Sequence, residues 1–209
     1  MVTEPSLGRI VLLNGVPRAG KSSIAVAIQD SFDGVWLNLG LDLFKSATPA
    51  RYQPGIGLRP GGEGPHLEPL VATLYRGLYE STAAHSRLGV NVVADVGHHD
   101  GYSRPLGILP ACAAVLAGLP AWLVGVRCPI EVIMARRQAT WGRSYADDGS
   151  IPPPILRFQQ LVHVPGIYDL ELDTSQLTPE ACAAAIRHHI DHGPPPSALA
   201  RLAQMGAAS

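Results

Sequence analysis

A stretch near the start of the chain has the residue types and spacing that hold a chain of phosphates. Residues 15–22 read Gly-Val-Pro-Arg-Ala-Gly-Lys-Ser and match the pattern G-x-x-x-x-G-K-[ST] at every fixed position. The glycines let the backbone turn so that successive N–H groups point at phosphate oxygens. Lys21 can place its charge on the β- and γ-phosphates, and the Ser22 hydroxyl can bind Mg²⁺. We expect a nucleotide to contact Gly15, Val16, Pro17, Arg18, Ala19, Gly20, Lys21, Ser22 and Ser23.

Two aspartates follow apolar runs further along the chain. Asp42 comes shortly after the run 35–39, and Asp95 lies near the end of the run 90–96. If both runs are strands of one parallel sheet, both carboxylates lie at the edge where ligands bind, near the γ-phosphate. One could take the proton of an acceptor hydroxyl, and the other could hold Mg²⁺ through water. The structural alternatives are a helix N-cap for Asp42 and a turn at a strand end for Asp95.

Arginines gather in the segment after the apolar run 121–126. Arg127 ends that run, Arg136 and Arg137 fall in the helix expected next, and Arg143 comes just past it. Arg136 and Arg143 are seven residues apart, a spacing that puts two side chains on one helix face. When a lid closes, such arginines can neutralise the charge that spreads over a transferring phosphoryl group. The alternative is a basic helix face in contact with solvent.

The elements that must position these residues alternate between two kinds. Short apolar runs predict strands, and longer segments with apolar residues at helical spacing predict helices. The predicted strands are 9–14, 35–39, 90–96, 121–126 and 168–172, and the predicted helices are 21–32, 66–86, 104–117, 129–141 and 178–192. The phosphate loop follows the first strand directly and precedes the first helix. We therefore predict an α/β protein of three layers, with a five-stranded parallel sheet and a helical lid, in residues 1–192.

Three segments depart from this alternation. Residues 48–65 are rich in Gly and Pro, and we expect them to form an insertion on the acceptor side of the site. The lid is expected at about residues 129–160, where 142–154 are polar and then proline-rich. Residues 193–209 begin Gly-Pro-Pro-Pro and are expected to form a loosely attached tail.

The composition limits the classes of partner. The formal net charge is −1, so we expect neither nucleic acid nor a membrane surface to be a partner. The N-terminus lacks the pattern of a signal peptide, and no run has the length of a membrane span, which favours a cytoplasmic location. The partners expected are a nucleotide and a small-molecule acceptor, and the sequence leaves a homo-oligomer open.

The type of phosphate-loop protein follows from what the chain lacks and from its length. The guanine-reading motif Asn-Lys-x-Asp of GTPases does not occur, and 209 residues are too few for a motor or large ATPase. A small kinase remains, with ATP as the expected nucleotide and GTP left open, and with Mg²⁺ bound by Ser22 and Asp95. His98 and His99 follow Asp95 and are candidates for substrate contact or for a solvated loop pair.

The chain resembles the chloramphenicol phosphotransferase family up to about residue 189. The resemblance rests on residues 10–23, on Gly-Leu-Asp-Leu at 40–43, on 92–96, on Leu-Val-Gly-Val-Arg-Cys at 123–128, and on 163–174. It implies ATP-dependent phosphorylation of a hydroxyl on a small antibiotic, with Asp42 as catalytic base and Lys21, Arg136 and Arg143 beside the phosphates. An arginine of the family pattern falls on Thr140, and the first of two consecutive acids falls on Ala94.

The acceptor itself stays open at this point. Residues 48–65 differ in composition from the corresponding stretch of the family, so a chloramphenicol-like compound and another natural product, such as a nucleoside antibiotic, are both compatible with the sequence. The expected role is self-resistance or antibiotic inactivation. One alternative is a metabolite kinase of shikimate or gluconate type, for which Arg51 and Arg59 are the candidate anion contacts. The other is a non-catalytic nucleotide-binding protein, against which Lys21, Ser22 and Asp42 argue.

Overall fold

A computed structural model describes residues 6–142 and 145–207. Within them, the strands form one parallel sheet of five strands in the order β2-β3-β1-β4-β5. The strands are β1 (Ile10–Asn14), β2 (Trp36–Asn38), β3 (Asn91–Val96), β4 (Ala121–Arg127) and β5 (Leu170–Asp173). The predicted α/β fold and the number and direction of the strands are therefore confirmed, with strand ends that shift by one or two residues.

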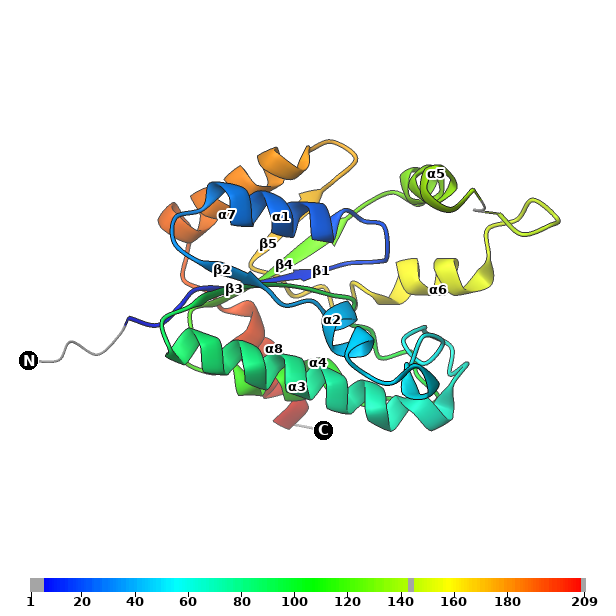
Figure 1. Cartoon of the computed structure of the whole chain (residues 1–209), viewed down its shortest axis with the longest axis horizontal. Coiled ribbons are helices and arrows are strands. Elements are labelled where there is room, and N and C mark those ends of the chain that lie inside the picture. Colours follow the sequence, from blue (N-terminus) through cyan, green and yellow to red (C-terminus); the bar gives the residue numbers. More distant parts are fainter. Residues whose placement is uncertain (1–5, 143–144, 208–209) are drawn as a thin grey trace, which may run out of the picture.

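Helices cover both faces of the sheet (Figure 1). On one face lie α1 (Lys21–Ser31) and α7 (Pro179–His192). On the other lie α3 (Glu68–Arg87), α4 (Ile108–Val115) and α8 (Ala198–Ala207). Beyond the carboxyl ends of the strands lie α2 (Leu41–Ser46), α5 (Ile130–Trp141) and α6 (Pro153–Leu161). Two short 3-10 turns, Ala50–Tyr52 and Pro65–Leu67, interrupt the connection between α2 and α3.

The core divides between the two faces because side chains alternate along each strand. In β1, Ile10 and Leu12 pack with Tyr75 and Leu78 of α3 on one face. Val11 and Leu13 pack on the other face with the apolar residues of α1 and α7, such as Ile24. The apolar residues of β1 are 0% exposed. A strand buried on both faces explains why 10–13 reads as an unbroken apolar run.

The register of the sheet brings the ends of its central strands together. Asn14, the last residue of β1, pairs with Val96 of β3 on one side and with Gly125 of β4 on the other. The chain that leaves β1 therefore emerges at the middle of the carboxyl edge. The strand order reverses at β1, and such a switch point is where open α/β sheets bind ligands.

Two regions differ from what the sequence predicts. Contrary to the prediction from the sequence, residues 198–207 do not belong to a loosely attached tail. They form α8, which packs against α4 and β4. Ala198, Leu199 and Leu202 are buried there, because the apolar side chains of α8 repeat at helical spacing. The proline-rich end of 142–154 leads into α6, which begins with Pro153 in a first-turn position that tolerates proline. No helix among the described residues is long and apolar enough to cross a membrane.

Candidate active site

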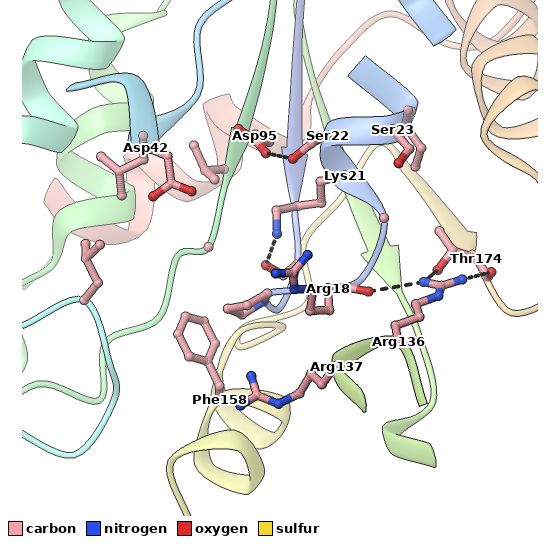
Figure 2. A pocket seen from close by; sticks show the side chains of 18 of the residues that line it. Arg18, Lys21, Ser22, Ser23, Asp42, Asp95, Arg136, Arg137, Phe158 and Thr174 are labelled. Atoms are coloured by element: carbon pink, nitrogen blue, oxygen red, sulfur yellow. Dashed lines mark hydrogen bonds between the residues drawn. The ribbon is translucent and has the colours of Figure 1, made fainter. Parts of the chain in front are cut away.

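A cleft of about 820 Å³ opens at the carboxyl ends of β1 and β3. The phosphate loop forms its floor (Figure 2). One wall comes from α2, α3, residues 55–59 and α6, and the opposite wall comes from α5 and the start of α7. The cleft therefore joins segments that are far apart in the sequence, including both regions predicted to serve as insertion and lid.

Bonds from outside fix the shape of the phosphate loop. Arg18 and Gly20 have positive φ angles of 71° and 94°, and Gly20 stands at the N-cap of α1. The Thr174 hydroxyl donates to the Ala19 carbonyl over 2.7 Å, and the Arg136 guanidinium donates to the Arg18 carbonyl over 3.2 Å. The bonds to these two carbonyls brace the conformation of the loop. The N-terminus of α1 then points its dipole into the cleft.

Lys21 lies half-buried beneath the loop (Figure 2). Its ammonium donates to the carbonyls of Gly15 and Val16 over 2.8 and 2.9 Å. Burial lowers the pKa of Lys21 from 10.5 to about 8, although the nearby charges of Asp95 and Asp42 act in the opposite direction. The ammonium is thus held in place by the two carbonyls and attracted by the nearby carboxylates of Asp95 and Asp42. Phosphate oxygens would replace the carbonyls as its partners.

Ser22 and Asp95 meet at the base of the cleft, as Figure 2 shows. The Ser22 hydroxyl donates to Asp95 Oδ2 over 2.7 Å. Gly40 passes close beside this carboxylate, and a Cβ at position 40 would lie 1.9 Å from Asp95 Oδ1. A hydroxyl and a carboxylate side by side, next to the phosphate loop, are oxygen ligands of the kind Mg²⁺ prefers. These residues therefore fit a magnesium ion.

Asp42 lies in the first turn of α2 and lines the cleft opposite the phosphate loop. The N-cap of this helix is Gly40, so the N-cap role considered for Asp42 does not apply. The Asp42 side chain is 83% exposed and pairs with Lys45 over 2.7 Å. An exposed pair of this kind contributes little to stability, so the carboxylate is available to a ligand in the cleft.

The arginines of the lid separate into different positions. Arg136 donates to the Thr174 carbonyl over 2.7 Å and to the Thr174 hydroxyl over 3.1 Å, which ties it to the outer side of the loop. Arg137, the next residue, lies toward Phe158 on the cleft side (Figure 2). Arg143 falls outside the described residues. Because α5 ends at Trp141, helical spacing does not place Arg143 relative to Arg136.

The acceptor side of the cleft is a wall with apolar and basic residues. Leu58 and Arg59 come from the insertion, Tyr75 from α3, and Phe158 from α6. Arg51, the other sequence candidate for an anion contact, does not line this cleft; its guanidinium lies over the Tyr52 ring, 4.7 Å from the centroid.

Anchors hold this wall in place. His99 Nε2 lies 3.0 Å from the Leu58 carbonyl, and Arg157 of α6 pairs with Glu63 over 2.6 Å. His99 and His98 are both buried, and neither lines the cleft. Burial lowers the pKa of His98 to about 3. The expectation of a solvated histidine pair is therefore wrong, and these residues support the wall from behind.

Several cleft residues were not assigned a role from the sequence. Tyr75 belongs to the buried stripe Val71, Tyr75, Leu78 and Tyr79 of α3, and this aromatic spacing was the available signal. Phe158 lies on α6, whose sequence begins with prolines and gave no helical signal. Thr174 closes the segment 163–174 that carries the family resemblance, but its contact with the phosphate loop depends on the order of the strands.

A parallel sheet with a phosphate loop between β1 and α1, and a cleft that holds acidic and basic residues, defines the class of P-loop kinases. Solved structures share this fold. The Mycobacterium tuberculosis APS kinase CysC, in complex with AMPPNP and APS, has a TM-score of 0.60 and 18% identity over 90% of this chain and 99% of its own. Shikimate kinase from Acinetobacter baumannii, in complex with shikimate, has a TM-score of 0.59 and 12% identity over 88% and 94%. The Deinococcus radiodurans tunicamycin resistance protein has a TM-score of 0.55 and 14% identity over 88% and 95%.

The chain belongs to the chloramphenicol phosphotransferase-like protein family, whose model matches residues 8–191. A relative from Mycobacterium tuberculosis (strain ATCC 25618 / H37Rv), Rv2636, is 27% identical over 217 residues, which cover 93% of this chain and 88% of the relative. The name of that relative proposes an O-phosphotransferase activity. The resemblance found in the sequence is confirmed, and the protein is a kinase of this family.

Proposed function

We propose that the protein transfers the γ-phosphoryl group of ATP to a hydroxyl group of a small antibiotic-like natural product. One observation carries the proposal: the phosphate loop with Lys21 and the carboxylate of Asp42 line the same cleft from opposite sides. A donor phosphate on the loop and an acceptor hydroxyl at Asp42 would then face each other. Such a modification would inactivate the compound or protect a producer from it.

In this mechanism the P-loop amides and Lys21 hold the β- and γ-phosphates of ATP. Asp42 takes the proton of the acceptor hydroxyl as its oxygen bonds to the γ-phosphorus, and the bond from that phosphorus to the bridging oxygen breaks, which leaves ADP. Ser22 and Asp95 would hold Mg²⁺, which would offset the negative charge of the phosphates. Arg18 of the phosphate loop also lines the cleft and could contact the same phosphates. ATP is proposed as the nucleotide from the family.

The acceptor wall suits a molecule that is partly apolar. Leu41, Leu58, Tyr75 and Phe158 line the cleft together with Asp42. Apolar and aromatic walls with a few polar groups are typical of small-molecule sites. They match a natural product with an apolar portion and an exposed hydroxyl, and a nucleoside antibiotic is among the candidates. One neighbour by fold is itself named as a tunicamycin resistance protein.

A second acceptor class has a specific observation in its favour. Lys45 and Arg59 both line the acceptor side, and either could bind a carboxylate or phosphate of a small hydroxylated metabolite. Each already has an acidic neighbour, Asp42 at 2.7 Å and Glu63 at 3.8 Å. An anionic acceptor would therefore have to compete with these pairs, which is why the antibiotic-like acceptor is preferred.

A screen of acceptors tests the proposal. The purified protein with MgATP would be incubated with hydroxylated antibiotics, nucleoside types included, and with hydroxylated carboxylic acids, and the gain of a phosphate would be followed by mass spectrometry. Lys21→Met is the matched inactive variant. Phosphate gain by the antibiotic set alone supports the proposal, and gain by the acids supports the metabolite class. Nucleotide binding without transfer to any acceptor would favour a non-catalytic role and overturn both.

A further inference from the structure

Arg137 lies where the lid, the phosphate loop and the acceptor wall meet. It belongs to α5, lines the cleft, and extends toward Phe158 of α6 in Figure 2. The neighbouring residue, Arg136, is instead bonded to Thr174 and to the Arg18 carbonyl of the phosphate loop. Both arginines line the cleft, but consecutive helix residues are rotated by about 100° about the axis, so their guanidinium groups extend in different directions.

The charged residues near Arg137 lie on both the donor side and the acceptor side of the cleft. Burial, and then the positive charges of Arg18 and Arg59, lower the pKa of Arg137. Arg18 belongs to the phosphate loop, where the donor binds, and Arg59 belongs to the acceptor wall. Arg137 is thus within electrostatic range of a donor-side and an acceptor-side residue. The positive charges of Arg18, Arg59 and Arg137 repel one another. An anion bound among them would offset this repulsion.

The position of this arginine group is held by the surrounding structure. The wall that carries Arg59 is tied to α6 through the Glu63–Arg157 pair and through the bond from Arg157 Nε to the Pro60 carbonyl over 3.2 Å. Phe158, next to Arg157 on α6, packs close to Gly97 at the cleft. The lid helix α6 and the acceptor wall therefore form one connected side of the cleft. Arg137 lies over its junction with the phosphate loop.

Arg137 shares one face of α5 with another residue of the cleft. Thr140 stands three residues later on the same face of α5 and also lines the cleft. In the family resemblance this position corresponds to an arginine. A guanidinium at position 137 reaches the same face one helical turn earlier. The resemblance by itself assigns lid roles to Arg136 and Arg143 and none to Arg137.

We propose that Arg137 is a further catalytic residue, whose guanidinium binds the phosphoryl group as it passes from the nucleotide to the acceptor. This inference rests on the proposed function of the site. A planar guanidinium can bind two equatorial oxygens at once and is charged throughout the reaction. Arg137 is aimed at the negative charge that spreads over these oxygens during transfer. It therefore binds the transition state more strongly than it binds ATP.

The experiment compares two nucleotide complexes that need no acceptor. MgAMPPNP represents bound ATP, and MgADP with aluminium fluoride represents the transferring phosphoryl group. Affinities would be measured by calorimetry for wild type, Arg137→Gln, Arg137→Lys and the control Arg201→Gln, which changes an exposed arginine on α8. We expect Arg137→Gln to weaken the fluoride complex about 100-fold and MgAMPPNP less than about 3-fold. Arg137→Lys should fall between, and Arg201→Gln should match wild type.

The outcomes separate the inference from the proposed function. Equal affinity of wild type and Arg137→Gln for the fluoride complex would overturn the role of Arg137. An equal loss for both complexes would also overturn it, because that pattern indicates ground-state binding or a damaged fold. A wild-type protein that binds MgAMPPNP but not the fluoride complex would overturn the phosphotransferase proposal, and the inference with it.

Discussion

Ser22 and Asp95 are joined by a hydrogen bond of 2.7 Å between the second residue of α1 and the penultimate residue of β3. The bond links two segments that are 73 residues apart, and it exists because β1 and β3 are adjacent and in register. Asp95 pairs with Leu13, so it lies just below the point where the phosphate loop leaves β1. Sheet topology thus places the carboxylate beside the hydroxyl.

This relationship predicts how the protein depends on magnesium. Asp95→Asn keeps an acceptor for the Ser22 hydroxyl but removes the negative charge, so it should raise the Mg²⁺ concentration needed for half-maximal nucleotide hydrolysis by about 10- to 100-fold. Ser22→Ala should act in the same direction. A Mg²⁺ titration at saturating nucleotide measures the effect. Asp30→Asn, on an exposed part of α1, is the control. An unchanged Mg²⁺ requirement in Asp95→Asn would remove Asp95 from the metal site.

Asp42 should matter for transfer and not for nucleotide binding. Asp42→Asn keeps the size and can still bond to Lys45, but it cannot take a proton, so transfer to a competent acceptor should fall by about 10²- to 10⁴-fold. Affinity for MgAMPPNP should change less than about 3-fold. Steady-state rates and calorimetry give the two values, with the exposed Asp33→Asn as control. Undiminished transfer by the Asp42 variant would exclude it as the base.

The pKa of Lys21, about 8 in the folded protein, predicts a pH dependence of nucleotide affinity. Only the ammonium form attracts phosphate. Below that pKa the lysine is already charged, and binding needs no proton. As the pH rises through the pKa the free protein loses the proton and must regain it on binding, so the dissociation constant should rise by up to about tenfold per pH unit.

Calorimetry in two buffers with different ionisation enthalpies measures this proton uptake directly. Uptake should approach one proton on the alkaline side and vanish near neutral pH. Lys21→Arg, which stays charged throughout this range, should remove the pH dependence even if its affinity is lower. Identical wild-type affinities across the range would show that Lys21 keeps its proton in the free protein.

Arg136 should contribute to stability through the phosphate loop. Its guanidinium bonds to the carbonyls of Arg18 and Thr174 and to the Thr174 hydroxyl. Arg136→Gln leaves these half-buried groups without their charged donor, so the free energy of unfolding should fall by about 2 kcal/mol. Denaturant unfolding measures it, and the exposed Arg104→Gln should change stability by less than about 0.5 kcal/mol. If both variants unfold alike, Arg136 does not brace the loop.

The packing of α8 predicts that the C-terminal helix belongs to the folded domain. Leu202 is 1% exposed and packs in the core on the α3 and α4 face of the sheet. Leu202→Ala should lower the free energy of unfolding by about 2 to 4 kcal/mol, because it removes buried methyl groups and leaves a cavity. Gln204→Ala, on the exposed side of α8, is the matched control. Equal stability of the two variants would contradict a docked helix.

Much of the architecture could be predicted because its signals are local. The phosphate loop is one continuous turn between a buried strand and a helix, so its residues and its neighbours in sequence fully describe it. The apolar runs predicted each strand of the sheet, and Thr178 with Pro179 predicted the start of α7, where the Thr178 hydroxyl accepts from the Ala181 N–H. The helix α6 was not predicted because it begins with prolines. The helix α8 was not predicted because Gly-Pro-Pro-Pro precedes it.

The orientations of the two neighbouring lid arginines could not be predicted from the local sequence. Nothing in the sequence around Arg136 and Arg137 states which of them bonds to Thr174 and which extends toward Phe158, because that depends on how α5 is oriented in the fold. The insertion is a second case: the glycines and prolines of 48–65 indicate an irregular segment, but its anchors at His99 and Arg157 lie far along the chain. Side chains at such long separations take their partners from the packing of the elements that carry them.

The sequence by itself therefore determined the phosphate loop, the class of sheet and the family of this kinase, since each depends on residues that are adjacent or regularly spaced. Only the tertiary structure decided that Ser22 meets Asp95, that Asp42 faces the loop across a cleft, and that Arg136 bonds to the loop while Arg137 extends toward Phe158. The physical reason is that strand order and helix rotation are set by burial of the whole core, and the cleft forms where those elements end.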